Sequence, residues 1–185
     1  MRTLVVYESM YGNTQEIAEA VAAGLRTAGE ARVLPVREAV LASLDGIDLL
    51  VVGGPTHAWG MTRARTRAQA ITDGHRKGLR VTARPGDLGL REWLASQTGN
   101  GNGLASAAFD TRIKAPAAVT GRASRGMVRW LRRNGLVVLA PAVSFFVTRD
   151  SRLLAGETDR ARRWGRELAE RAGRREPSVK QAKQA

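Results

Sequence analysis

The sequence predicts an α/β protein built on a parallel sheet that is covered by helices on both faces. Two apolar runs, residues 4–7 and 47–52, have the composition of strands buried on both faces of such a sheet. The first run is followed by apolar residues at helical spacing: Ile17, Ala18, Val21, Ala22 and Leu25. Five strand segments alternate with helical segments along the chain, which is the pattern of a parallel sheet with crossover helices.

A polar loop joins the first strand to the first helix and reads Ser9-Met10-Tyr11-Gly12-Asn13-Thr14. The first turn of a helix leaves backbone N–H groups unpaired, and the helix dipole favours an anion at that point. Ser9 and Thr14 add hydroxyl donors, and Gly12 permits a backbone conformation and a close ligand approach that a side chain would forbid. We therefore predict a phosphate site, with an ordinary helix cap by Asn13 or Thr14 as the alternative.

Two common nucleotide-binding loops are excluded. The chain has no G-x-x-x-x-G-K-[ST] motif, so the loop does not match the phosphate loop of ATP- and GTP-binding proteins. The first strand is also not followed by G-x-G-x-x-G, the dinucleotide-binding fingerprint. The predicted phosphate therefore belongs to another ligand.

A second loop follows the strand at residues 47–52 and reads GGPTHAWGM over residues 53–61. Both loops resemble those of the flavodoxin family, whose first loop runs roughly [ST]-x-T-G-x-T. Ser9, Gly12 and Thr14 match that pattern, whereas Tyr11 stands where the family usually has threonine. The segments S-M-Y-G and P-T-x-x-W-G are also similar to those of flavodoxin-like NAD(P)H:quinone oxidoreductases.

The resemblance implies a five-stranded sheet of order 2-1-3-4-5 with FMN at the switch in strand order, between the first and third strands. In that family the first loop holds the ribityl phosphate, the second lies along the flavin ring, and a third reaches the pyrimidine edge. Carried over to this sequence, the FMN-binding residues are Ser9, Met10, Tyr11, Gly12, Asn13, Thr14, Pro55, Thr56, His57, Ala58, Trp59, Gly60, Asp110, Thr111 and Arg112.

Individual roles follow from the same resemblance. Trp59 is the candidate to stack on the flavin. The alternative is that Trp59 belongs to the core and covers the ends of the strands. Gly60 allows a peptide flip beside flavin N5, and His57 is a candidate donor to the ring or an exposed spacer. The third loop departs from the family because no aromatic residue lies between positions 110 and 129. One ring face is therefore open to a substrate or to Tyr11.

The remaining elements are predicted from periodicity and turn residues. Strands are expected at 31–36 and 104–109, and a final strand at 136–147 is interrupted at Pro141, which cannot donate to a ladder. Short helices are expected at 38–44 and 87–97. A helix at 61–77 is expected to carry Ala64, Ala68 and Ile71 inward, and others are expected at 123–133 and near the C-terminus. We predict one domain at 1–173 and a disordered basic tail at 174–185.

Composition narrows the functional classes. The chain has 185 residues and 43% hydrophobic content, enough for one domain with a full core. It contains no cysteine and only two histidines, which excludes thiol chemistry and disulfides and argues against a metal site. No apolar run reaches the roughly 20 residues of a membrane helix. We expect a cytoplasmic protein.

The net charge of +13 departs from the usually acidic flavodoxins. A field of this sign attracts an acidic partner surface or a nucleotide, while the absence of a recognised module makes nucleic acid an unlikely ligand. Three functions remain in view: an FMN protein that carries electrons between partner proteins, an FMN enzyme that takes hydride from NAD(P)H and reduces a quinone, and a flavin-free binding module. The sequence does not decide whether the chain is an enzyme.

Overall fold

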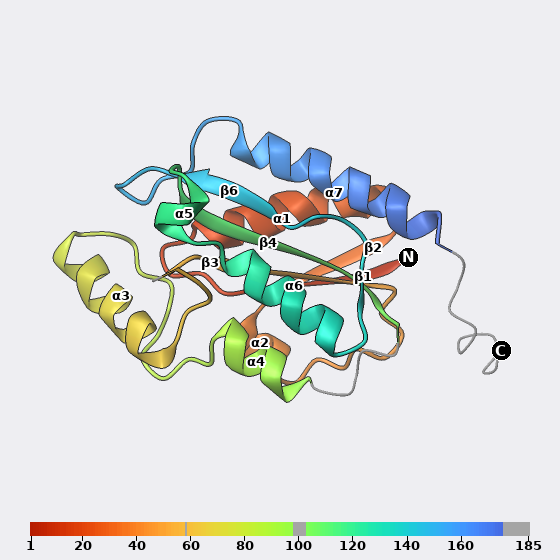
Figure 1. The fold of residues 1–185 in the computed structure, drawn as a ribbon, viewed down its shortest axis with the longest axis horizontal. Helices are drawn as coiled ribbons and strands as arrows, with labels where there is room; N and C mark the ends of the chain where they lie inside the picture. Colours follow the sequence, from red (N-terminus) through yellow and green to blue (C-terminus); the bar gives the residue numbers. More distant parts are fainter. Residues whose placement is uncertain (58, 98–102, 176–185) are drawn as a thin grey trace.

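The computed structural model describes residues 1–57, 59–97 and 103–175. Its elements (Figure 1) are β1 (Arg2–Tyr7), α1 (Asn13–Leu25), the short 3₁₀ helix η1 (Arg26–Ala28), β2 (Glu30–Pro35), α2 (Val36–Ala39), β3 (Leu49–Pro55), α3 (Ala64–Arg76), α4 (Leu90–Ser96), β4 (Ala105–Ile113), α5 (Ala117–Thr120), α6 (Ala123–Arg133), β5 (Val137–Val138), β6 (Val143–Val147) and α7 (Glu157–Gly173).

The strands form one parallel sheet of order β2-β1-β3-β4-β5, which confirms the predicted topology. A sixth strand, β6, also pairs with β4, further along the same side as β5. The break between β5 and β6 contains Pro141, as the sequence predicts. β4 is longer than expected and continues to Ile113, so Asp110, Thr111 and Arg112 lie within the strand rather than in a loop after it.

Helices cover the sheet on both sides (Figure 1). On one face, α1 and α7 pack against alternate residues of β1, β3 and β4, among them Val5, Val51 and Ala107. On the other face, α2, α4 and α6 cover the intervening residues, such as Val6 and Val52. Because both faces are buried, β1 and β3 are apolar at consecutive positions rather than at every second one.

An aromatic cluster between α7 and the sheet sets the distance between this helix and the strands β4 and β6. Phe109, Phe145 and Trp164 meet edge to face, with ring centroids 5.8–6.2 Å apart. The Phe109 ring lies over Gly53, where an added Cβ would fall 2.0 Å from the ring. Gly53 therefore leaves the space that this ring occupies.

The buried side of α3 differs from the one predicted. Ile71 is buried as expected, but Ala64 and Ala68 are exposed and Arg67 is buried instead. The Arg67 guanidinium lies 3.0 Å from the Glu92 carboxylate of α4 and 3.3 Å from the Thr62 hydroxyl. A paired arginine can be buried, and this pairing rotates the helix away from the face that its apolar residues suggest.

The predicted tail lies, from residue 176 on, outside the described residues. Before that point, the chain is still tied to the domain, because the Arg175 guanidinium donates to the Gly103 carbonyl at 2.7 Å. No helix in the described ranges is both long enough and apolar enough to cross a bilayer.

We expect Gly24→Ala to destabilise the protein, because α1 and α7 touch at glycines. A Cβ on Gly24 would lie 2.2 Å from the carbonyl oxygen of Arg162 on α7. Overpacking of this kind costs about 1–3 kcal/mol of unfolding free energy, measurable by urea denaturation. The control is Gly173→Ala at the end of α7, where no atom lies within 4 Å and stability should hold or rise. Equal effects of the two substitutions would refute the close-contact explanation.

Candidate functional site

Loop one, residues 8–12, joins β1 to α1 and leaves the first turn of α1 open. Gly12 is the residue before the helix, and its φ of +92° lies in the left-handed region that favours glycine. No side chain caps α1, and its first helical hydrogen bond runs from the Glu16 N–H to the Gly12 carbonyl. The amides of Asn13, Thr14 and Gln15 are therefore free of helical acceptors. The Ser9 hydroxyl accepts from the Gly12 N–H at 3.1 Å, which closes the loop.

A second helix, α6, begins at the same edge of the sheet but has its first amides occupied. The Thr56 hydroxyl accepts from the Ala123 N–H at 2.9 Å. The Asp110 carboxylate accepts from the N–H and the hydroxyl of Ser124, at 2.9 and 2.8 Å. Of these two helix starts, α1 is thus the one whose positive end is available to an anion from outside.

Threonines join the strand ends beneath loop one. The hydroxyls of Thr14 and Thr111 lie 2.8 Å apart in the interior, and this contact links the first turn of α1 to β4. The Thr56 N–H donates to the Thr111 carbonyl at 2.9 Å, which extends the link to β3. These contacts bring residues from the three predicted segments together.

Loop two, residues 56–63, presents a strained and exposed tryptophan. His57 and Gly60 exchange two backbone hydrogen bonds, at 2.9 and 3.0 Å, and so close a tight turn. Trp59 has a φ of +75°, which is unusual for a bulky residue, and its side chain is 65% exposed. Gly121 pairs with Trp59, and a Cβ there would lie 2.3 Å from the Trp59 backbone. Strain of this kind is commonest at functional sites.

The residues predicted for the third contact are held by the protein itself. Asp110 is fully buried, and among the described residues its Oδ1 has no hydrogen-bond partner. The Arg112 guanidinium donates to the Ala115 carbonyl at 2.6 Å and to the Thr120 hydroxyl at 2.9 Å, and it lies over the Phe146 ring. Burial lowers the pKa of Arg112 from its ordinary value. Arg112 thereby ties α5 to the end of β4.

Comparison with known proteins agrees with this geometry. The sequence model of the flavodoxin family matches residues 5–84, a stretch that contains both loops. Among solved structures, the chain is similar to a flavodoxin from the domain Archaea, with 20% identity, a TM-score of 0.62 and coverage of 94% of this chain and 99% of the other. The chain has a flavodoxin-like fold.

Two further structures share this fold. Flavodoxin 1 from Bacillus cereus is 18% identical with a TM-score of 0.64, and the match covers 92% of this chain and 98% of the other. A flavodoxin, WrbA-like protein from Agrobacterium tumefaciens is 20% identical with a TM-score of 0.60 and coverage of 95% and 99%. No curated protein matches in sequence.

Most predicted site residues lie at one edge of the sheet, where β1, β3 and β4 end. Ala58 lies outside the described residues. Sequence reasoning missed the segment after β6, which comes beside loop one because the Asn13 side chain donates to the Ser151 carbonyl at 2.9 Å. The available signal was topological, since the carboxyl end of every parallel strand lies at this edge.

Burial within loop two lowers the pKa of His57 from its ordinary value of 6.5, which favours a neutral imidazole.

Tyr11 does not lie free above loop one, as one of the two sequence-based alternatives required. Its hydroxyl donates to the Ala70 carbonyl of α3 at 2.7 Å. Its ring packs against Gly74, where an added Cβ would lie 2.7 Å from the ring. The segment after α3 also contacts loop one, because the Thr82 N–H donates to the Met10 carbonyl at 2.8 Å. Tyr11 therefore anchors α3.

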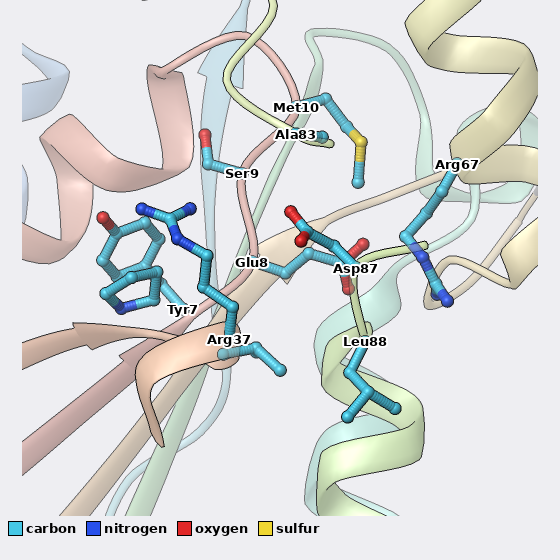
Figure 2. A pocket seen from close by; sticks show the side chains of 11 residues that line it. Tyr7, Glu8, Ser9, Met10, Arg37, Arg67, Ala83, Asp87 and Leu88 are labelled. Carbon is cyan, nitrogen blue, oxygen red and sulfur yellow. The ribbon is translucent and has the colours of Figure 1, made fainter. Parts of the chain in front are cut away.

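Glu8, the first residue of loop one, has a buried side chain that accepts hydrogen bonds from other parts of the site. It accepts from the Thr62 hydroxyl at 2.5 Å and from the Leu90 N–H at 2.8 Å, so it joins loop one, loop two and the start of α4. Figure 2 shows Glu8 among side chains that come from loop one, α2 and α3. Burial raises the pKa of Glu8 above its ordinary value of 4.5, and the two hydrogen bonds oppose that shift.

Two cavities lie in this part of the structure, and Glu8 lines the smaller one. The one in Figure 2 measures about 30 Å³ and has room for about one water molecule. A larger one of about 490 Å³ lies between α3 and residues 84–88, and Arg67, Asp87 and Leu88 line both. None of the described residues of loop two up to Gly60 lines either cavity, whereas Ser9 and Met10 of loop one line the smaller one.

We expect the stability gap between the wild type and Glu8→Gln to depend on pH. The folded state raises the pKa of Glu8, so it binds this proton more tightly than the unfolded chain does. The wild type should therefore lose stability relative to Glu8→Gln as the pH rises from 4.5 through the raised pKa. Urea denaturation across this range measures the gap. A gap that is constant, or that moves the other way, would contradict the assignment.

Proposed function

We propose that this flavodoxin-like protein binds FMN between loop one and loop two and carries electrons through it to partner proteins. The observation that supports this most directly is the uncapped start of α1 at the sheet edge that also holds the exposed Trp59. The uncapped start of α1 suits a phosphate, and the exposed Trp59 indole suits an aromatic ring. FMN contains both, and when bound it supplies the redox chemistry.

The phosphate end is suited by what loop one offers. The amides of Asn13, Thr14 and Gln15 point out of the first turn without helical acceptors, and the helix dipole adds positive potential. The Ser9 hydroxyl accepts one hydrogen bond from Gly12 and keeps its own proton to donate. Tyr11 is held against α3, so its side chain does not compete for the same place.

The ring end is suited by loop two. The Trp59 indole is exposed while its backbone is fixed by the turn and by Gly121, so it offers a stacking surface whose position is set before binding. The neutral form of His57 has one N–H to donate and one nitrogen to accept. The contacts of Asp110 and Arg112 with Ser124, Ala115 and Thr120 suggest that both shape the ring pocket through α5 and α6.

A second candidate is an FMN-dependent NAD(P)H:quinone oxidoreductase. It is favoured by the absence of an aromatic residue from positions 110–129, together with the attachment of Tyr11 to α3. Neither an aromatic residue of the third loop nor Tyr11 would then cover the second face of the flavin ring. An uncovered ring face would leave room for a nicotinamide or a quinone. A cytoplasmic location fits either function.

We expect the purified protein to bind FMN and to bind riboflavin at least about tenfold more weakly, because only FMN carries the phosphate. Titration with quenching of flavin fluorescence measures both affinities. Trp59→Ala should weaken FMN binding, whereas Trp59→Phe should keep most of it because phenylalanine retains a stacking ring. Equal affinity for the two flavins would overturn the phosphate site. Failure to bind either flavin would favour the flavin-free binding module.

Turnover separates the two redox functions. For an electron carrier, we expect FMN-loaded protein to oxidise NADPH or NADH with a quinone at a negligible rate, and to be reduced quickly once a flavoprotein reductase is added. Absorbance of NAD(P)H in the steady state measures this, with free FMN at the same concentration as the control. Sustained turnover above that control, without a reductase, would establish the oxidoreductase instead.

A further inference from the structure

One side of α6 carries four exposed arginines, Arg125, Arg129, Arg132 and Arg133, which we call the arginine face. Their spacing of four, seven and eight residues from Arg125 places them along one side of the helix. Within the described ranges, none of the four takes part in an ion pair. The arginine face is thus a row of cations without counter-charge.

The surrounding chain supplies no counter-charge either. Between Glu92 and Asp150 the only acidic residue is Asp110, which is buried and bonded to Ser124. The same stretch holds eight basic residues: Arg112, Lys114, Arg122, Arg125, Arg129, Arg132, Arg133 and Arg149. The strands that pack against α6 are β3, β4 and β5, and Asp110 is their only acid. The strands beneath α6 therefore provide no exposed acidic residue to this face.

Helix α7 provides the contrast within the same molecule. It is also rich in arginine, but it contains four acidic residues, Glu157, Asp159, Glu167 and Glu170. Arg160 pairs with Glu157, and Arg162 with Asp159. If the basic residues were spread evenly over the surface, α6 and α7 would have a similar balance of basic and acidic residues. Of these two helices, α6 therefore carries the greater excess of positive charge.

An apolar group lies beside the start of α6. Trp59, Val119 and Ile113 are 65%, 64% and 42% exposed. Trp59 pairs with Gly121, two residues after Val119, and Arg112 ties the residues around Ile113 to Thr120. These side chains come from loop two, α5 and the end of β4, at the edge where the first residue of α6 bonds to Thr56. Exposed apolar residues with a charged border are typical of binding surfaces.

We propose that the apolar group Trp59, Val119 and Ile113, together with the arginine face, docks an acidic redox protein. This inference rests on the proposed function, because the docked partner would lie over the same edge that holds Trp59. The row of cations matches an acidic surface and speeds its approach, while the apolar group supplies desolvation at the centre. Small transient interfaces of this composition suit proteins that meet, exchange an electron and separate.

Other anionic ligands fit the face less well. The arginines follow a single convex helix and do not converge on one point, so a small anion finds no pocket there. A nucleic acid would pair with the arginines through its phosphates but would gain little from Val119 and Ile113. An acidic protein can pair its carboxylates with the arginine face and bury the apolar group at the same time.

The test uses an acidic [2Fe–2S] ferredoxin as the probe and measures its binding by calorimetry, with and without FMN. We expect binding at low salt that weakens by at least about tenfold between about 0.02 M and 0.5 M NaCl, because salt screens charge pairs. Arg125→Glu/Arg129→Glu should weaken binding by about tenfold or more at low salt. Cytochrome c, a basic redox protein, should not bind.

The matched control is Arg163→Glu/Arg166→Glu, which makes the same change in net charge at exposed positions of α7, on the opposite face of the sheet. It should change affinity by less than about threefold. Equal losses in the two double variants would assign the effect to net charge and overturn the docking surface. The docking surface is likewise overturned if ferredoxin fails to bind while a short DNA duplex binds and responds to the α6 variant.

The two proposals fail separately. If FMN does not bind but ferredoxin still binds through α6, the proposed function is wrong and the surface stands as a docking site. If FMN binds and ferredoxin shows no salt-sensitive affinity, the docking surface is wrong and the flavin site stands. Val119→Ser tests the apolar half, and it should weaken ferredoxin binding without changing the slope against salt.

Discussion

The parallel pairing of β1 with β3 is the contact on which the candidate site depends. Five residues of β1, from Thr3 to Tyr7, pair in register with Leu49 to Gly53 of β3. Both strands are buried on their two faces, so a slip of either strand would disturb its close packing against the helices on both sides. That register brings loop one and loop two to the same height at the sheet edge. With a different register, the uncapped amides of α1 and the Trp59 indole would lie too far apart to contact the same ligand.

Two helices that start at this edge use their positive ends differently. In α6, a threonine that follows β3 and an aspartate from β4 satisfy the first amides, so its start is part of the framework. In α1, the corresponding amides have no capping side chain. The difference cannot be seen in either helix alone, because the groups that cap α6 come from distant strands. It explains why only one of these two helix starts is a candidate for an anion.

The strands β1 and β3 and the two loops that follow them were predictable from sequence because their signals are local, and the resemblance of these loops to the flavodoxin family implied the order of the strands. Apolar runs mark β1 and β3, and the residues that follow them carry the family pattern. What the sequence did not reveal depends on partners far along the chain. The burial of Arg67 requires Glu92, the extension of β4 to Ile113 requires β6, and the position of Tyr11 requires α3. The left-handed Trp59 is likewise held by Gly121, which lies 62 residues later.

The glycine contact between α1 and α7 has a consequence at the other end of α1. Because Gly24 and Gly165 let the two backbones touch, α1 cannot slide or tilt against its neighbour without a steric clash. The amides of its first turn are therefore oriented before any ligand arrives. The entropy of arranging them is lost when the chain folds, so it does not reduce the affinity for a phosphate group. A site that would hold its ligand largely through main-chain N–H groups gains much of its strength from such preorganisation.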